Sequence, residues 1–415
     1  MGERGEGAVR PAAAEARPGP AGRAGRLPLI DALRGAAMLG IVLVNFPTMN
    51  TMAGDETTAY GGMQHPLDRW VGGANMVLLN GKFYPIFAFL FGLGLALADR
   101  AGGRPRRLAA RRLLLLLGVG LLHLLLVWWG DILVVYALLG LLVLPALGWP
   151  PRRLLLAAVA LLVLVPALSP LLALLDRIGL VAAGQGILPG LGLALPPPEA
   201  VAATYAHGTF PEMLHQRALD YLSDFTPFAG REASPAKLLG YGTYYAQLLG
   251  LMLLGAWAGR QGLHARLGEE RAWTRRAWWV VALPAALLTA LRYGVPGLDA
   301  PLAYPQADAL ALAYLLGLAR LLVAWPRARA AFEAVGRLSL TAYLAHTTLC
   351  SLLLYATGLG LYGSIGPAAL LPLSLGCYAL VAWGAGWWSR RFALGPAEWV
   401  WRSLLHGRAL PLRVR

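Results

Sequence analysis

The stretch LLHLLLVWWGDILVVYALLG at residues 121–140 decides the fold class of this chain. It is apolar enough to lie in the hydrocarbon core of a bilayer, yet it contains His123 and Asp131. Ionisable groups inside a membrane are costly, and they usually face the interior of a helical bundle or a water-filled cavity. The stretch therefore predicts two membrane-spanning helices joined near Gly130, with His123 and Asp131 facing a polar cavity near the outer end of a bundle.

The composition extends this interpretation to the whole chain. Of its 415 residues, 58% are hydrophobic and only 14% are charged, which is too apolar for an ordinary soluble domain. Apolar runs long enough to cross a bilayer recur along the chain, and helices satisfy their own backbone hydrogen bonds in lipid. We therefore expect an all-α, polytopic transmembrane helical bundle of about ten spans. The expected spans are 30–50, 77–98, 113–129, 131–148, 154–175, 238–258, 277–293, 305–325, 337–356 and 367–388.

Three segments follow from the distribution of apolar and polar residues. Residues 1–26 are rich in Gly, Ala, Pro, Arg and Glu and predict a disordered basic cytoplasmic tail. Residues 27–390 form the transmembrane bundle, with a long extracytoplasmic connection at 178–236 that is expected to hold short amphipathic helices. Residues 391–415 predict a cytoplasmic tail that lies along the membrane interface.

The charge pattern predicts the orientation of the bundle. The formal net charge is +15, but the basic residues cluster in short segments between apolar runs, which argues against nucleic acid as a partner and for membrane lipids. With the N-terminus inside, 29 of the 36 basic residues lie on the cytoplasmic side. This asymmetry predicts that both termini are cytoplasmic. Trp128 and Trp129 are then expected at the outer interface.

The chain offers no familiar catalytic signature and no cluster with metal-ligand spacing, so no metal is expected. The two cysteines, Cys350 and Cys377, both fall in predicted spans and imply no disulfide framework. Polar residues inside the membrane are the remaining candidates for chemistry.

Five candidates lie toward the outer face: His123, Asp131, Asn45, Lys82 and His65. Each has a plainer structural alternative. Asp131 is suited to capping the helix that follows it, and His123 to a neutral hydrogen bond with a neighbouring helix. Lys82 can extend to the interface, and His65 lies in a loop, where a histidine usually has no function.

Four further candidates lie deeper or toward the cytoplasm. Asp31 and Arg34 are three residues apart on one helix face and form either a structural pair or part of a site for an anionic cofactor such as the phosphates of CoA. Tyr343 and His346 share a face in a later span.

Several stretches resemble the YeiB-like family of bacterial membrane proteins, a domain of unknown function. The resemblance rests on LIDALRGAAMLGIVLVNF, GKFYPIFAFLFGLG, RRLLLLLGVGLLHLLLVWWGDILVVYALLG, LLGLMLLGAWAGRQGL, GRLSLTAYLAHTTLCSLLLYATGLGLYG and GPAEWVWRSL, which occur in family order. The family is similar to a wider group of transmembrane acyltransferases that includes heparan-α-glucosaminide N-acetyltransferase. The resemblance implies a multi-pass protein of the bacterial cytoplasmic (inner) membrane.

The chain departs from the patterns of these relatives at two positions. The wider group commonly has an Arg followed, after ten residues, by a His in the first span; here Arg34 matches the Arg, and Asn45 stands where the His would be. The heparan enzyme has its catalytic His in the following luminal loop, where His65 occupies a similar region. The YeiB-like pattern has Gln where this chain has His346. These departures leave the identity of the catalytic base open.

The resemblance implies transfer of an acyl group, expected to be acetyl, from cytoplasmic acyl-CoA to a hydroxyl or amine of a sugar or other small acceptor. His123 or His65 would be the general base, Asp131 would orient it, and Asn45 or Lys82 would stabilise the oxyanion. Arg34, Asp31, Tyr343 and His346 are the expected cofactor-side residues. The alternative is a transporter or flippase for a small solute or lipid-linked sugar, whose pathway the same residues would line. Whether the chain forms a homo-oligomer is left open.

Overall fold

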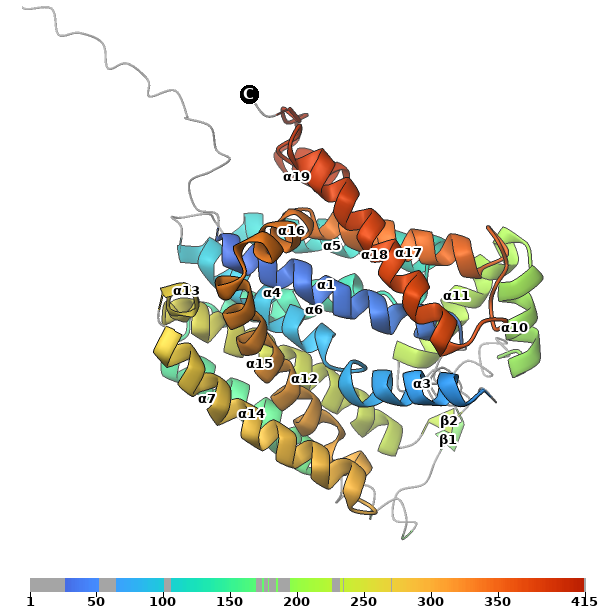
Figure 1. The fold of residues 1–415 in the computed structure, drawn as a ribbon, viewed down its shortest axis with the longest axis horizontal. Coiled ribbons are helices and arrows are strands. Elements are labelled where there is room, and N and C mark those ends of the chain that lie inside the picture. Colours follow the sequence, from blue (N-terminus) through green and yellow to red (C-terminus); the bar gives the residue numbers. More distant parts are fainter. Residues whose placement is uncertain are drawn as a thin grey trace, which may run out of the picture.

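The computed structural model describes residues 27–51, 65–100, 106–168, 174, 178, 184–185, 195–225, 232–233, 235–269 and 271–413. The expected tail at 1–26 lies outside the described residues. Within them the chain is an all-α bundle, as predicted, with one two-residue antiparallel strand pair (Figure 1). The first half contains α1 (Pro28–Met49), α3 (Pro66–Leu78), α4 (Phe83–Arg100), α5 (Arg106–Leu126), α6 (Leu133–Ala146), α7 (Pro151–Val159), the π-helical turn η1 (Ala160–Leu164) and β1 (Gly184–Gln185). The second half contains α10 (Pro198–His207), α11 (Phe210–Phe225), β2 (Glu232–Ala233), α12 (Pro235–Arg260), α13 (Leu263–Glu269), α14 (Arg271–Gly294), α15 (Asp299–Ala324), α16 (Pro326–Arg337), α17 (Ser339–Leu354), α18 (Pro367–Ser389) and α19 (Pro396–His406).

Eight of the ten expected spans each overlap one helix. The span expected at 77–98 is interrupted between α3 and α4, and the span expected at 154–175 is helical as far as residue 168, beyond which most of it lies outside the described residues. In the described part of the chain, seven helical stretches are long and apolar enough to cross a membrane, and Leu133–Ala146 and Ser339–Leu354 are shorter apolar helices. The protein is therefore a polytopic membrane protein. The number of spans that cross the bilayer and the side on which the termini lie stay predictions.

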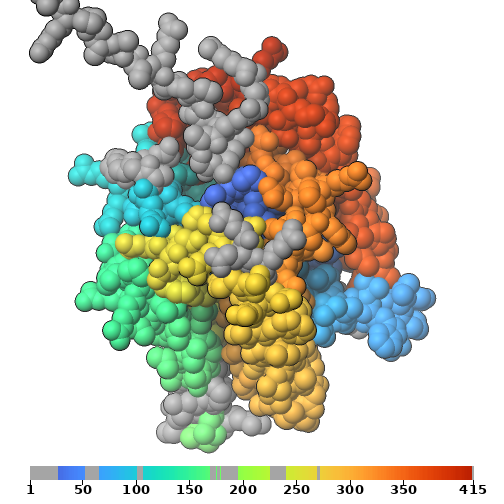
Figure 2. Space-filling model, turned by 60° about the vertical axis from the view of Figure 1, so that its left-hand side comes forward, coloured from blue at the N-terminus to red at the C-terminus, as the bar shows by residue number. Residues whose placement is uncertain are grey.

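The helix α1 lies at the centre of the bundle. Two thirds of its apolar window is buried, and only a small dark-blue patch of it reaches the face shown in Figure 2. Its close approach to α16 depends on glycine, because a Cβ at Gly35 would lie 1.9 Å from the Phe332 carbonyl oxygen. A similar contact joins α4 to α12, where a Cβ at Gly92 would lie 1.9 Å from the carbonyl oxygen of Met252.

The bundle has two distinguishable ends. α4, α6 and α12 end, and α5 begins, at what we call the basic end, where Arg100 and Arg260 donate to the terminal carbonyls of neighbouring helices. The opposite end carries α10 and α11, and Figure 1 shows these two helices and α13 at opposite ends of the bundle. Both are short helices within the connection at 178–236, and α11 has the amphipathic character expected there.

The expectation that Trp128 and Trp129 lie at the outer interface is wrong. Both side chains are buried, with 4% and 3% of their surface exposed, in a core cluster that also contains Tyr205 and Met213. The physical reason is that α10 and α11 cover the end of α5, so the two indoles pack against protein rather than at the lipid boundary.

Candidate functional site

Two of the outer candidates, His123 and Asp131, form a buried hydrogen-bonded relay with Thr347. His123 Nδ1 lies 2.7 Å from Asp131 Oδ2, and His123 Nε2 lies 2.8 Å from Thr347 Oγ1. The three side chains come from α5, the α5–α6 turn and α17, and at most 3% of each residue is exposed. The relay thus joins an acid, an imidazole and a hydroxyl in the order used by hydrolases and acyltransferases that rely on a hydroxyl–His–Asp arrangement.

The backbone around Asp131 explains why the carboxylate reaches His123. Its second oxygen, Oδ1, accepts a hydrogen bond from the Val134 amide at 2.8 Å, which caps the start of α6. Gly120 lies one turn before His123 on α5, and a Cβ there would come within 2.9 Å of Asp131 Oδ1. Asp131 therefore has both of the roles considered for it: it caps α6, and it binds the His123 imidazole.

Hydrogen-bond chemistry restricts the roles of the two imidazole nitrogens. Thr347 Oγ1 also lies 2.9 Å from the Tyr343 carbonyl oxygen, which can only accept. If the hydroxyl donates to that carbonyl, it accepts from a protonated Nε2, and Nδ1 must also carry a hydrogen to donate to the Asp131 carboxylate. If the hydroxyl turns toward Nε2, it donates to the lone pair of that nitrogen, and Nδ1–H donates to Asp131. The direction of the Thr347 hydroxyl is therefore tied to whether Nε2 carries a hydrogen.

Tyr343 and His346, expected on the cofactor side, lie beside the relay. The Tyr343 ring centroid is 5.0 Å from that of His123 and 5.5 Å from that of His346. His346 Nδ1 lies 3.0 Å from the Ala342 carbonyl oxygen and must donate to it, so Nε2 is an acceptor in the neutral ring. Nε2 is buried without a hydrogen-bond partner among the described residues. His346 therefore offers a second imidazole nitrogen next to the relay.

The other outer candidates make contacts elsewhere. His65 is exposed and caps α3, its Nδ1 accepting from the Leu67 amide at 3.2 Å. Lys82 does not extend to the interface: it is 1% exposed, and its Nζ donates to the Met76 carbonyl at 3.1 Å. Asn45 is half-buried on α1. None of the contacts described for these three residues reaches His123.

Toward the basic end, Asp31 and Arg34 form the expected pair. Arg34 Nη1 lies 3.3 Å from Asp31 Oδ1, and 29% of the arginine side chain and 17% of the aspartate side chain remain exposed. The pair lies on α1 where α1 meets α4, since a Cβ at Gly94 would be 3.0 Å from Arg34 Nη2. A structural ion pair is enough to explain the geometry of Asp31 and Arg34. Part of the Arg34 guanidinium remains exposed and is accessible to a ligand.

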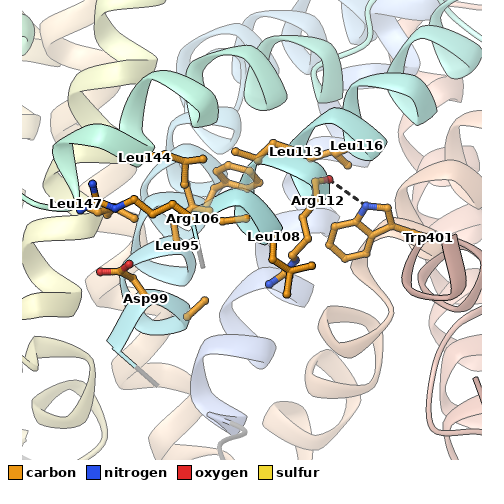
Figure 3. A pocket seen from close by; sticks show the side chains of 13 residues that line it. Leu95, Asp99, Arg106, Leu108, Arg112, Leu113, Leu116, Leu144, Leu147 and Trp401 are labelled. Carbon is orange, nitrogen blue, oxygen red and sulfur yellow. Dashed lines mark hydrogen bonds between the residues drawn. The ribbon is translucent and has the colours of Figure 1, made fainter. Parts of the chain in front are cut away.

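The basic end also holds a pocket that the sequence did not reveal (Figure 3). It has a volume of about 90 Å³ and lies between α4, α5, α6 and α19. Asp99 and Arg106 lie on one side, and Arg112 and Trp401 on the other, around a leucine-rich interior. The Arg112 guanidinium stacks 5.0 Å from the Trp401 ring centroid, and the Trp401 indole N–H donates to the Arg112 carbonyl at 3.1 Å.

The pocket and the relay lie on one face of α5. Leu113 and Leu116 line the pocket, and Gly120 and His123 follow on the same face at helical spacing. With a rise of about 1.5 Å per residue, Leu116 and His123 are separated by roughly 10 Å along the axis. The pocket and the relay are therefore two separate sites along the same buried face of α5.

Among the described residues, no group of three or more His, Cys, Asp or Glu side chains is placed to hold a metal ion. Cys350 and Cys377 are buried and not disulfide-bonded.

The sequence matches known proteins over nearly its whole length. The family model described as "Protein of unknown function (DUF418)" matches residues 258–408. The chain is 30% identical to the uncharacterized protein YeiB of Escherichia coli strain K12, over 90% of this chain and 95% of that protein. It is 29% identical to the uncharacterized protein YxaH of Bacillus subtilis strain 168, over 91% of this chain and 94% of that protein.

Proposed function

The chain belongs to the YeiB-like family of membrane proteins, and from the geometry of its bundle we propose that it is an integral membrane acyltransferase. It moves an acyl group, acetyl in the simplest case, from cytoplasmic acyl-CoA to a hydroxyl or amine of a sugar or other small acceptor. The membrane is the cytoplasmic membrane of a bacterium, and the basic end faces the cytoplasm.

The observation that carries the proposal is the buried Asp131–His123–Thr347 relay. If the His123–Asp131 pair served only to join two helices, it would need no hydroxyl at the second imidazole nitrogen. A hydroxyl at 2.8 Å from Nε2, with the carboxylate at 2.7 Å from Nδ1, is the arrangement in which imidazole accepts a proton from an O–H group. Thr347 occupies the place on Nε2 that the acceptor hydroxyl takes during turnover.

The residues then act in a defined order. Asp131 fixes the ring of His123 and stabilises its positive charge, and His123 Nε2 removes the acceptor proton while the acceptor oxygen or nitrogen attacks the thioester carbonyl. The carbon–sulfur bond breaks as the tetrahedral intermediate collapses, and His123 returns the proton to the CoA thiolate. Tyr343, whose ring lies tilted against that of His123, restricts the imidazole to this orientation.

The pocket at the basic end supports the donor half of the proposal. Acyl-CoA combines phosphates, which arginine binds well, with a long pantetheine arm that suits an apolar interior. Arg106 and Arg112 would hold phosphate, and the arm would follow the α5 face toward His123. Arg34, whose guanidinium is partly exposed beside Asp31, is the further candidate for phosphate contact.

The test is release of free CoA thiol from acetyl-CoA by the protein purified in detergent, with a small-molecule extract of the host cell as the source of acceptor. We expect Asp131→Asn and His123→Gln to lower the rate by roughly a hundredfold or more, the usual contribution of a general base. The matched control is Asp308→Asn. Asp308 is another buried acid, and it accepts a hydrogen bond from Gln247 at 2.7 Å rather than from a member of the relay. The rate of CoA release by this variant should stay within about threefold of the wild-type rate.

Two outcomes would contradict the proposal. One is equal rates in wild type, Asp131→Asn and Asp308→Asn. The other is an absence of extract-dependent CoA release by folded wild-type protein, which would move the assignment to transport and make solute flux the next measurement.

A further inference from the structure

A buried arginine near the relay lacks a counter-charge. Arg217 on α11 has 0% of its surface exposed, and arginine stays protonated at any pH a protein tolerates. Its Nη1 donates to the last carbonyls of α5, at 3.2 Å to Leu125 and 2.8 Å to Leu126. Its Nε and Nη2 atoms have no hydrogen-bond partner in the described part of the chain. The contacts to α5 therefore use only part of the donor set.

The nearest acid does not neutralise this charge. Asp220, one turn further along α11, accepts hydrogen bonds from the Tyr205 hydroxyl at 2.6 Å and from Gln216 at 2.7 Å. No ion pair joins Arg217 to an acid among the described residues. The guanidinium lies over the Tyr355 ring at 5.3 Å from its centroid, which attracts the charge but supplies no acceptor for Nε and Nη2. A buried charge in this state is strongly destabilising unless something else pairs with it.

Two further groups around Arg217 that can donate a hydrogen bond have no partner among the described residues. The Trp128 indole N–H and the Tyr355 hydroxyl are buried without a hydrogen-bond partner among the described residues. Trp128 follows the carbonyls that Arg217 caps, and Tyr355 lies under the guanidinium. Hydrogen-bond donors without partners around the Arg217 guanidinium favour binding of an oxyanion and disfavour binding of a cation or an apolar group.

The spacing to the relay suits a small molecule. Thr347 and Tyr355 are eight residues apart at the end of α17, which corresponds to roughly 12 Å along the helix. On α5, His123 precedes Leu126 by less than one turn. A molecule with an oxyanion on Arg217 can therefore present a hydroxyl or amine to His123 if it has the dimensions of a substituted sugar.

We propose that Arg217 binds an oxyanion, a phosphate or a carboxylate, carried by the acceptor of the acyl group. The inference rests on the proposed function for the role of the ligand as acceptor, whereas the anion site itself rests on Arg217. In the described conformation the site is closed, so binding requires α11 to separate from the end of α5 and to close again over the ligand. The class of acceptor is an anionic hydroxyl or amino compound, and neutral sugars bind poorly.

The experiment is thermal unfolding of the full-length protein in detergent, titrated with glucose 6-phosphate, glucuronate or glucose at matched ionic strength. A ligand that binds only the folded state raises the unfolding temperature in proportion to its occupancy. We expect the two anions to stabilise wild type and glucose to have no effect. Arg217→Gln should weaken the apparent affinity for the anions by roughly ten- to a hundredfold, the usual effect of losing charge-assisted hydrogen bonds.

The matched control is Arg260→Gln. Arg260 also donates to carbonyls at the end of a helix, those of Leu147 and Trp149, but at the basic end of the bundle. We expect this variant to keep the anion-dependent stabilisation. Where Arg217→Gln does not unfold cooperatively, Arg217→Lys replaces it: a lysine keeps the charge but not the planar fork, so the anion affinity should still fall about tenfold.

The results distinguish a failure of the anion site at Arg217 from a failure of the proposed acyltransferase function. Equal anion stabilisation in wild type and in the Arg217 variants, or none in wild type, overturns the anion site even if CoA release depends on His123. Arg217-dependent stabilisation in a protein that never releases CoA keeps the site and overturns the acyltransferase.

Discussion

At the scale of single residues, the molecule concentrates its unusual polar groups in one half of the bundle. Asp131, His123 and Thr347 are hydrogen-bonded to one another, and His346 and Arg217 keep nitrogens without partners among the described residues. Buried polar groups in native proteins are normally satisfied, so such a concentration indicates a site for a reacting or bound molecule. Asp220, on α11, lies in the same part of the molecule, and its pKa of about 6 falls in a pH range in which stability can be measured.

We expect Asp220 to give stability a specific pH dependence. Burial raises the pKa of Asp220 from 3.8 to about 6, against the lowering effect of its hydrogen bonds to Tyr205 and Gln216. Between these two values the folded state binds more protons than the unfolded state, so the free energy of unfolding falls as the pH rises and levels off above about 6. The shift corresponds to at most roughly 3 kcal/mol. Thermal unfolding in detergent from mildly acidic to neutral pH measures it.

The variant Asp220→Asn should flatten this decline relative to wild type. Glu212→Gln is the control of opposite sign, because hydrogen bonds from Thr209 lower the pKa of the exposed Glu212 carboxyl, so any stabilisation by that acid is lost as the pH falls. An unchanged slope in Asp220→Asn would show that Asp220 does not titrate as described.

The relay shows how far single residues can be predicted from sequence. His123 and Asp131 stand out because they are ionisable residues in an apolar stretch. Thr347 does not, since a threonine in a membrane helix usually bonds to the carbonyl four residues earlier, as it does here with Tyr343. Arg217 is likewise unremarkable in a polar connection. Only the packing of α11 on α5 reveals that it is buried and incompletely paired.

At the scale of elements, helix crossings depend on glycines that bring backbones together. A Cβ at Gly92 on α4 would lie 1.9 Å from the Met252 carbonyl oxygen, and one at Gly255 on α12 would lie 1.9 Å from the Phe89 carbonyl oxygen. Small residues at such crossings permit the close packing that holds membrane helices together. The crossing of α4 and α12 fixes one wall of the bundle beside the pocket at the basic end.

Replacing Gly92 with alanine should force these helices apart and lower the free energy of unfolding by about 1–3 kcal/mol, the usual effect of overpacking. Gly384→Ala on α18 is the matched control, because a Cβ there meets no atom within 4 Å, and alanine should leave stability unchanged or raise it slightly. Unfolding temperatures in one detergent compare the two. Equal temperatures for both variants would contradict the tight crossing.

Long apolar helices could be located from sequence, but several shorter elements and their packing could not. The span expected at 77–98 is interrupted near Lys82, between α3 and α4, where Gly81 has a φ of 80°. The helix α16 lies between the spans expected at 305–325 and 337–356, where no helix is predicted. The role of α19 was also hidden, because its Glu398 side chain binds the first amides of α17 and its Trp401 lines the pocket. These contacts join segments far apart in sequence, and hydropathy carries no information about them.

At the scale of the whole molecule, the proposed acyl transfer requires two sites that are reached from opposite sides of a membrane. The arginine-lined pocket opens at the basic end, and the relay with Arg217 lies toward the end covered by α11. Positive charge predicts that the basic end faces the cytoplasm. A donor from the cytoplasm and an acceptor from the other side would then meet at His123.

The orientation can be tested with reporters fused after residue 415. We expect a C-terminal green fluorescent protein to fluoresce and a C-terminal alkaline phosphatase to be inactive in a bacterial host, since both termini are predicted to be cytoplasmic. A phosphatase inserted between residues 194 and 195, ahead of α10, should be active. The reverse pattern would place the pocket on the wrong side for cytoplasmic acyl-CoA.

The most direct test of the central claim is calorimetric binding of acetyl-CoA to the purified protein. We expect saturable binding to wild type, binding weakened roughly tenfold or more in Arg106→Gln, and binding unchanged in His123→Gln. The proposed function requires the phosphates of the donor to bind at the pocket, which Arg106 lines, and the chemistry to take place at His123, further along α5. Absence of binding to folded wild-type protein, or equal binding in wild type and Arg106→Gln, would contradict the account.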